Sequence, residues 1–387
     1  MDSSSPSSAV ASPGAGGERR VLALAVAGGL VFVAGLFLEP RRVWLGYLLA
    51  FSLLAQLALA GPVFLALLAL SGARWATALR RVPEAMGGAL PLALAAGAVL
   101  LSGMHSLYEW SHPAALEHDA LLAHKAAWLN PTGFAVRTLV ILALWWAGAA
   151  WLRRSQAGAP ARRLARSGVF MVLVAVSFSI ASVDWWMSLE PHWFSTLFPL
   201  YHFAGLACAG LAMALLLVLH LERRGPLAGV VRDEHLHDMG RLLFAFTLVW
   251  AYLWYCQYML IWYTDIPEET GYYLLRKQHG WWLLVQCTLV LKWGVPFLAL
   301  LGRRPCRSRR VLGRVAVVVL VGHVLDLYVQ IAPPLMDGGP RLGAWELGPT
   351  LAALALFLAA FGRSFRRAPP VPEGDPALPD SLAYHVP

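Results

Sequence analysis

Four ionisable side chains interrupt stretches of this sequence that are otherwise apolar enough to cross a lipid bilayer. They are Asp184, His202, Lys292 and Asp326. An Asp or Lys at the centre of a membrane helix costs about 2.5–3.5 kcal/mol on insertion scales, so such residues are rarely kept without a use. They usually mark a proton or ion route, or a polar ligand site inside a helix bundle.

Asp326 shares a helical face with two other polar residues. His323 precedes it by three positions and Gln330 follows it by four, and residues at these spacings lie on one side of a helix. We expect a hydrogen bond between His323 and Asp326, which would suit proton transfer. The alternative is a polar pair that only fixes the packing of helices.

Lys292 and His202 lie deep within their apolar stretches. Lys292 is about 13 residues from the start of its stretch, roughly 20 Å at 1.5 Å per residue. We therefore expect an anionic partner for it, with snorkelling to the far membrane edge as the alternative. His202 is predicted to join the proton route, the alternative being a hydrogen-bonded core histidine. Because the buried histidines lie at unmatched depths, haem ligation is not expected.

Asp184 ends a stretch that also carries hydroxyl groups. These belong to Ser177, Ser179 and Ser182. The series could relay protons, or it could form a polar strip against another helix. Arg137 is predicted to pair with Asp184 or with Glu109, more as a structural ion pair than as a proton carrier.

An aromatic face is predicted within residues 241–263. Tyr255, Tyr258 and Trp262 share it, with Gln257 beside it. Aromatic walls with phenol donors suit a quinone ring, so Tyr258 and Trp262 are candidate quinone-binding residues. Aromatic packing without a ligand is the alternative.

The elements that position these residues are membrane-spanning helices. Of 387 residues, 58% are hydrophobic and only 14% are charged, which predicts an all-α integral membrane protein. Ten stretches have the required length: 21–38, 44–70, 86–104, 132–152, 165–186, 193–221, 241–263, 279–301, 311–331 and 347–362. Residues 19–367 form the predicted membrane domain, between disordered cytoplasmic tails at 1–18 and 368–387.

The net charge of +9 follows membrane topology. With the N-terminus in the cytoplasm, 23 of the 31 Lys and Arg fall on the cytoplasmic side and six on the opposite side. This positive-inside asymmetry predicts that both termini are cytoplasmic, and it accounts for the basic charge without a nucleic-acid partner. The four cysteines are scattered and no C-x-x-C-H occurs, so no covalently bound cofactor or metal centre is predicted.

Several motifs together resemble a known family. They are 105–112 (HSLYEWSH), 183–191 (VDWWMSLEP), 257–263 (QYMLIWY) and 266–269 (IPEE). With the ten-helix layout, they resemble the F subunit of bacterial alternative complex III, a member of the NrfD/PsrC-like membrane family.

The resemblance implies two four-helix bundles plus flanking helices in the bacterial inner membrane. It also implies a subunit of a quinol-oxidising respiratory complex. Menaquinone or ubiquinone would be the quinone, and the partners would be a homologous quinone-binding membrane subunit, an iron–sulfur subunit and haem c subunits that carry the electrons. This chain would contribute proton conduction and could bind quinone, with His105, Glu109 and Arg137 at an outer exit or interface. A secondary transporter and a purely structural anchor are the alternatives.

Overall fold

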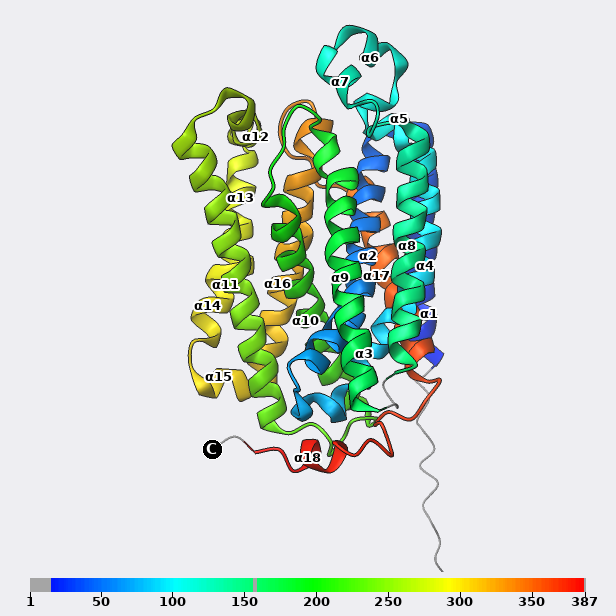
Figure 1. The fold of residues 1–387 in the computed structure, drawn as a ribbon, viewed down its shortest axis with the longest axis vertical. Coiled ribbons are helices and arrows are strands. Elements are labelled where there is room, and N and C mark those ends of the chain that lie inside the picture. The colour runs from blue at the N-terminus through cyan, green and yellow to red at the C-terminus, as the bar shows by residue number, and fades with distance from the viewer. Residues whose placement is uncertain (1–14, 156–158, 386–387) are drawn as a thin grey trace, which may run out of the picture.

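The structure consists of helices joined by short loops (Figure 1). The computed structural model describes residues 15–155 and 159–385, and no strand occurs among them. Residues 1–14 of the predicted N-terminal tail lie outside the described residues. The first helix already begins at Ala15, before the predicted boundary at residue 19.

Ten helical segments of the described chain are long and apolar enough to span a membrane, which confirms the predicted all-α integral membrane fold. Eight are continuous: α1 (Ala15–Leu38), α2 (Pro40–Leu70), α8 (Pro131–Arg153), α9 (Pro160–Trp185), α10 (Phe198–Arg224), α11 (Asp233–Thr264), α16 (Arg309–Ile331) and α17 (Ala344–Phe365). One is assembled from α3 (Arg81–Met86), α4 (Leu90–Leu100) and α5 (Met104–Leu107). The other joins α13 (Trp281–Leu289) to α14 (Val295–Leu300) through a π-helical turn, Val290–Gly294.

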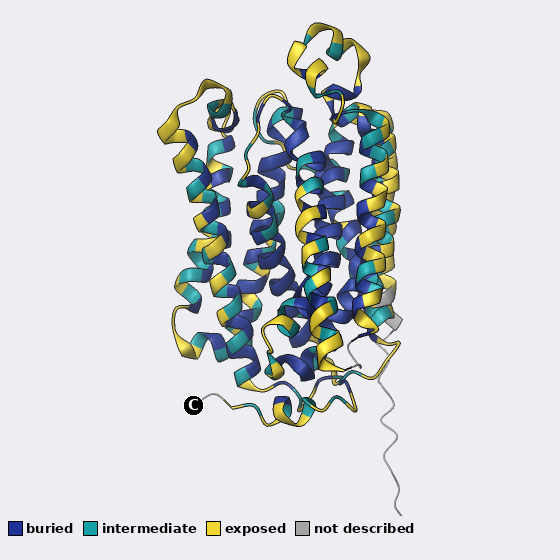
Figure 2. Cartoon of the chain, viewed as in Figure 1, coloured by how far each residue is buried: buried dark blue, intermediate teal, exposed yellow. Residues whose placement is uncertain are grey.

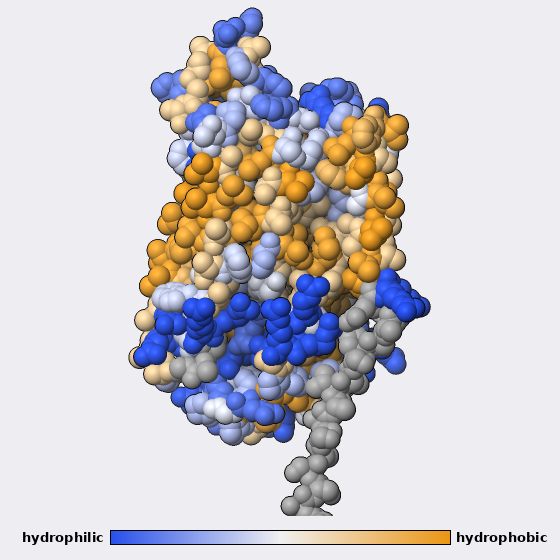
Figure 3. Space-filling view, turned by 90° about the vertical axis from the view of Figure 1, so that its right-hand side faces the viewer, coloured by the Kyte–Doolittle hydropathy of each residue, from blue (hydrophilic) through white to orange (hydrophobic). Residues whose placement is uncertain are grey.

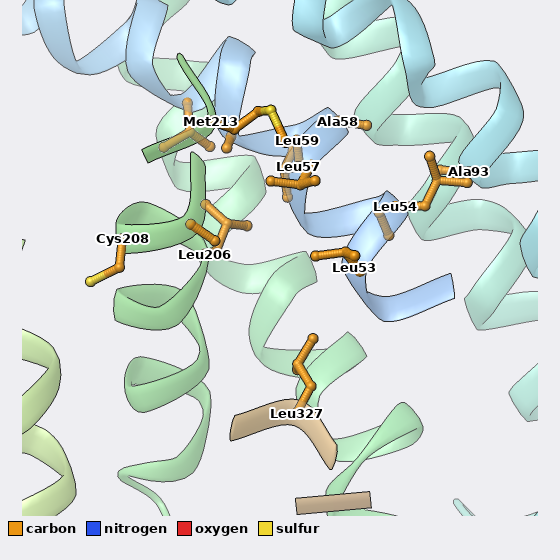
Figure 4. Packing of buried hydrophobic residues seen from close by; sticks show 14 of the residues in the cluster. Leu53, Leu54, Leu57, Ala58, Leu59, Ala93, Leu206, Cys208, Met213 and Leu327 are labelled. Carbon is orange, nitrogen blue, oxygen red and sulfur yellow. The ribbon is translucent and has the colours of Figure 1, made fainter. Parts of the chain in front are cut away.

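These segments form two four-helix bundles, as predicted. The first consists of α2, α4, α8 and α9, and the second of α10, α11, α16 and the interrupted helix α13–α14. α1 and α17 flank the first bundle and pack on α2. The two bundles meet where α2 contacts α10, and both of these helices are mostly buried (Figure 2). Figure 4 shows leucines of α2 at this junction, near Leu206 of α10 and Leu327 of α16.

Shorter helices cap the two ends of the bundles. One end, here named the α12 end, carries α6 (Pro113–His118), α7 (Ala120–Lys125) and α12 (Pro267–Lys277) (Figure 1). The other, here named the basic end, carries α15 (Arg303–Arg307) and α18 (Leu378–Leu382). A belt of apolar side chains lies between the ends, and strongly hydrophilic side chains border it toward the basic end (Figure 3). This is the surface expected of a chain surrounded by lipid.

Two glycines allow α1 and α2 to touch the backbone of α17. A Cβ atom on Gly46 would lie 2.0 Å from the carbonyl oxygen of Trp345, and one on Gly28 would lie 2.3 Å from that of Gly348. Small residues permit such close crossings in membranes, where packing rather than water exclusion holds helices together. Any side chain at these positions would push α17 outward.

The C-terminal segment differs from the prediction of a disordered tail. Residues up to 385 are described, and the segment from residue 368 packs across the basic end (Figure 1). Ser381 is buried and its hydroxyl accepts the Ala78 N–H at 3.0 Å, while Asp375 pairs with the Arg80 guanidinium. The proline content suggested disorder, but the polar residues between the prolines have fixed partners in the folded chain.

Candidate functional site

A buried ion pair lies inside the second bundle, between α13–α14 and α16. Lys292 Nζ is 2.7 Å from Asp326 Oδ2. Lys292 is fully buried, and its ammonium also lies over the Trp250 ring, 4.1 Å from the centroid. The expected anionic partner of Lys292 is therefore Asp326, and the side chain does not snorkel to a membrane edge. Such a pair needs further hydrogen bonds to offset its desolvation.

Two neutral side chains supply those hydrogen bonds to Asp326. The Tyr201 hydroxyl donates to Oδ1 at 2.5 Å. Gln330 Nε2 donates to the same oxygen at 3.0 Å. With the Lys292 ammonium on Oδ2, both carboxylate oxygens have donors. These three donors stabilise the ionised form of the Asp326 carboxylate inside the membrane.

The local backbone explains how Lys292 reaches α16. Pro296 has no N–H for the carbonyl of Lys292 and its ring crowds that carbonyl, so the α-helical ladder is interrupted and the π-helical turn Val290–Gly294 forms. Gly322 lets this turn approach α16, because a Cβ atom there would lie 2.8 Å from Lys292 Cγ. Gly205 leaves space for the ammonium on the opposite side, since its Cβ would lie 3.5 Å from Nζ.

His323 belongs to the same centre but has a different partner from the one predicted. Its Nδ1 lies 3.2 Å from Lys292 Nζ. An ammonium can only donate, so Nδ1 accepts and His323 is neutral with its proton on Nε2. The predicted hydrogen bond from His323 to Asp326 is wrong, because Nδ1 of His323 faces Lys292 and Nε2 has no partner among the described residues.

His202 lies one helical turn from Gly205 and stacks on Trp186, with ring centroids 4.1 Å apart. The Nε2 atoms of His202 and His323 and Oε1 of Gln330 are buried and form no hydrogen bond with the described residues. Buried polar atoms without protein partners are typical sites for bound water. These atoms mark where a bound water would join the centre, and the role of His202 stays a prediction.

A pocket reaches this centre from the α12 end. Its cavity volume is about 20 Å³, which is room for about one water molecule. Its aromatic lining comes from Tyr201, Trp254, Tyr272 and Tyr273, and its polar lining from Gln257, Thr288, Arg276, Asp326 and Gln330. Oε1 of Gln257 is buried and, like Oε1 of Gln330, has no hydrogen-bond donor among the described residues. The pocket wall thus contains two buried amide oxygens that have no hydrogen-bond donor among the described residues.

Asp184 and Arg137 form a second buried ion pair, in the first bundle. Arg137 Nε lies 2.6 Å from Asp184 Oδ2, and Trp128 Nε1 donates to Oδ1 at 2.9 Å. This confirms the predicted pairing of Arg137 with Asp184. The hydroxyls of Ser177, Ser179 and Ser182 do not form a proton relay, because each donates to the backbone carbonyl four residues earlier. The pair joins α8 to α9 near the α12 end of the first bundle.

The two candidate quinone-binding residues lie outside the pocket. Trp262 is 59% exposed on the outer surface of α11. Tyr258 is half-buried and stacks on Trp254, at 5.5 Å and an interplanar angle of 4°. The pocket is lined on α11 by Trp254 and Gln257. Tyr258 lies one helical turn from Trp254 and contacts Tyr273 of α12 and Trp282 of α13 beside the pocket, whereas Trp262 faces away from these helices.

His105 and Glu109 are exposed at the α12 end, in the first bundle. His105 Nδ1 lies 3.0 Å from Ser111 Oγ, and its carbonyl oxygen contacts His112 Nε2 at 2.8 Å. Neither residue lines the pocket in the second bundle. Their predicted role at an exit or interface stays a prediction.

Three residues around the pocket received no role from the sequence. Gln330 carried a signal, because it shares the helical face of Asp326. Tyr201 carried only its position beside His202. Arg276 carried none, since it lies in a short helix next to the exposed Lys277, yet it is 1% exposed.

No protein-family model matches the chain, and no curated protein is significantly similar to it.

Proposed function

We propose that this chain is a membrane subunit of a quinol-oxidising respiratory complex and that it conducts protons through the Lys292–Asp326 centre. One observation carries the proposal: a buried carboxylate, held by Lys292 and Tyr201, opens onto an aromatic pocket. Ionisable residues inside a helix bundle typically serve proton transfer or ligand binding. Here both possibilities meet at one carboxylate.

The lining of the pocket suits a hydroquinone headgroup, and the wall formed by α12 would have to move outward to admit one, because the closed pocket holds only about one water molecule. Its two unpaired polar atoms, Oε1 of Gln257 and Oε1 of Gln330, are acceptors. A ligand lying between aromatic side chains such as Trp254 and Tyr272 would satisfy them by donating hydrogen bonds. A quinol has two hydroxyl donors on a flat ring, whereas the oxidised quinone has only acceptors. Menaquinol and ubiquinol both meet this requirement.

Asp326 is the group placed to take a proton from such a ligand. It lines the pocket and faces Lys292 on its other side. Asp326 would act as the general base, and Lys292 would stabilise its charge. His323, which is hydrogen-bonded to Lys292 Nζ, would pass the proton on through bound water. The second hydroxyl proton of the quinol would follow the first through Asp326 once that carboxylate has passed its proton on. The two electrons would leave to iron–sulfur and haem c subunits, because this sequence has no cluster or haem-attachment motif.

The distribution of charge supports a location in the bacterial inner membrane with both termini cytoplasmic. The arginine-rich loops and the C-terminal segment lie at the basic end, and positive loops face the cytoplasm. The α12 end, with the exposed His105 and Glu109, would then face outward and meet the redox partners. A homologous membrane subunit would complete the complex.

Binding of a short-chain hydroquinone analogue to the full chain in lipid nanodiscs tests the proposal. We expect Gln257→Leu to raise the Kd about tenfold, because one ligand hydrogen bond is lost. Tyr255→Phe is the matched control, because Tyr255 is 55% exposed on the other face of α11. Absence of binding to the unaltered chain, or equal Kd values for Gln257→Leu and the unaltered chain, would contradict the proposal. A structural anchor or a transporter of another solute would give the first of these results.

A further inference from the structure

α12 forms one wall of the pocket and is joined to its neighbours by two unusual backbone positions. Asp265, before the helix, has φ 47°, and His279, after it, has φ 50°. They are the only non-glycine residues with positive φ among the described residues, and Gly280 follows with φ 87°. Left-handed conformations are rarely adopted by side-chain-bearing residues. Residues 262–268 and 277–280 are all exposed. The second connection contacts the rest of the chain through the His279 carbonyl, which lies close to Gly339.

α12 is held down from its inner face. Tyr272, Tyr273 and Arg276 are buried there, whereas the start of the helix and Lys277 are exposed. Tyr272 stacks on Trp193 of the loop before α10, with centroids 4.1 Å apart. The helix therefore lies over the pocket with a single contacting face.

Arg276 makes the polar contacts that fasten this face. Its guanidinium donates to Glu190 Oε1 at 2.7 Å and to the carbonyl oxygens of Val329 and Gln330 on α16, at 3.1 and 3.0 Å. It also lies 3.4 Å from the centroid of the Tyr272 ring. One side chain thus connects α12 to the loop after α9 and to the helix that carries Asp326.

Glu190 stabilises the buried charge of Arg276. Burial disfavours the charged guanidinium, but the neighbouring Glu190 carboxylate outweighs this and holds the pKa of Arg276 above its ordinary value. Arg276 is 1% exposed, and a buried cation that loses its anion is strongly destabilised where it lies. Removing the carboxylate would therefore favour conformations in which Arg276 reaches water.

We propose that α12 is a hinged lid over the pocket and that Arg276 is its positioning residue, latched by Glu190. The hinges are Asp265 and His279–Gly280, and opening exposes the pocket wall formed by Val329 and Gln330. Hinges of this kind are single residues at the ends of an element that absorb a backbone rotation. The lid controls the access of the quinol headgroup and so rests on the proposed function, but its movement is measurable without any quinol.

Thiol modification in the pocket tests the lid. Val329→Cys is introduced into the full chain with the four native cysteines replaced, and a water-soluble methanethiosulfonate is applied in lipid nanodiscs. We expect Glu190→Gln to raise the modification rate at least about tenfold, because the latch loses its anion. The matched control is Asp119→Asn, which removes the ion pair of Asp119 with His192 in the same loop region and leaves the rate unchanged. Equal rates in Glu190→Gln and its parent, or equal increases in both variants, would overturn the proposal.

Hydrogen–deuterium exchange provides a second measurement that does not depend on the cysteine variants. In the unaltered chain, the amides of 267–277 are expected to exchange together and faster than those of α13. Exchange of α12 no faster than α13 would overturn the lid. If the unaltered chain does not bind the quinol analogue but Glu190→Gln still raises the modification rate, only the proposed function is contradicted.

Discussion

At the scale of single residues, the Lys292–Asp326 pair combines a high desolvation cost with complete hydrogen bonding. The ammonium has a carboxylate, an imidazole nitrogen and an aromatic face as neighbours. Buried ion pairs of this kind often contribute little net stability compared with apolar replacements, although breaking one is costly. The pair is therefore better explained by proton chemistry than by stability.

Removing one partner of the pair should destabilise the protein more than removing both charges. Lys292→Met leaves Asp326 buried without its cation, which should lower the free energy of unfolding by about 3–5 kcal/mol. Lys292→Met combined with Asp326→Asn should recover much of that loss, because Asn keeps a polar group for Tyr201. Denaturant unfolding in detergent measures both. A double variant whose loss of unfolding free energy equals the sum of the losses in Lys292→Met and Asp326→Asn would contradict this account.

The close approach of the π-helical turn to Gly322 makes a further prediction. Gly322→Ala places a Cβ atom 2.8 Å from Lys292 Cγ, and such overpacking should cost about 1–3 kcal/mol. Gly313→Ala on the same helix is the control, because its nearest neighbour would be Leu219 Cδ1 at 3.5 Å, an ordinary contact. Thermal unfolding of the two variants compares them. Equal melting temperatures would show that the turn does not press on α16.

At the scale of elements, interrupted helices position the site. α13 and α14 would form one regular helix without Pro296, and the π-helical turn between them directs Lys292 toward α16. π-helical turns frequently occur at functional sites. A secondary transporter would place discontinuous helices at corresponding positions of both halves. In the described chain the interrupted span of the first bundle, α3–α4–α5, is the second helix of its bundle, whereas α13–α14 is the third helix of its own, so the two interruptions do not occupy corresponding positions.

The C-terminal segment is an element whose attachment should depend on pH. Burial alone would raise the pKa of Asp375, but the Ala377 N–H and the Arg80 guanidinium outweigh it and hold the pKa below its ordinary value. A carboxylate with a lowered pKa stabilises the fold above the unfolded pKa, and this contribution is lost as the pH falls through the folded one. We expect residues 368–385 to detach below about pH 4.

Hydrogen–deuterium exchange of that segment between pH 7 and pH 3 measures the detachment. Asp375→Asn should abolish the pH-dependent step, because no carboxylate remains to be protonated. A step of the same size in Asp375→Asn would assign the effect to another group.

At the scale of the whole molecule, the sequence was sufficient for the fold but only partly for the site. Hydropathy located the ten spans because bilayer thickness fixes helix length. The depth of Lys292 showed that it needed an anion, and Arg137 was matched to Asp184. The sequence did not identify Asp326 as the partner of Lys292, because the two residues are 34 positions apart and meet only when their helices pack together.

Other parts of the site depended on packing that periodicity does not reveal. The face of α11 that lines the pocket is set by α12 and α13, so the sequence placed Trp262 at a ligand site although it lies on the exposed surface. Arg276 looked like an ordinary loop charge because only the folded chain brings Glu190 to it. The C-terminal segment looked disordered because its partners, such as Arg80, are about 300 residues away in sequence.

Proton translocation by the complex reconstituted in liposomes tests the central claim most directly. The rate of proton movement driven by quinol oxidation is compared between the unaltered complex and Asp326→Asn, with Glu222→Gln at the basic end as the control. We expect Asp326→Asn to slow proton movement at least about a hundredfold, because the general base is lost, while the complex stays assembled and Glu222→Gln has little effect. Unchanged proton movement in an assembled Asp326→Asn complex would contradict the assignment of the Lys292–Asp326 centre as the proton route.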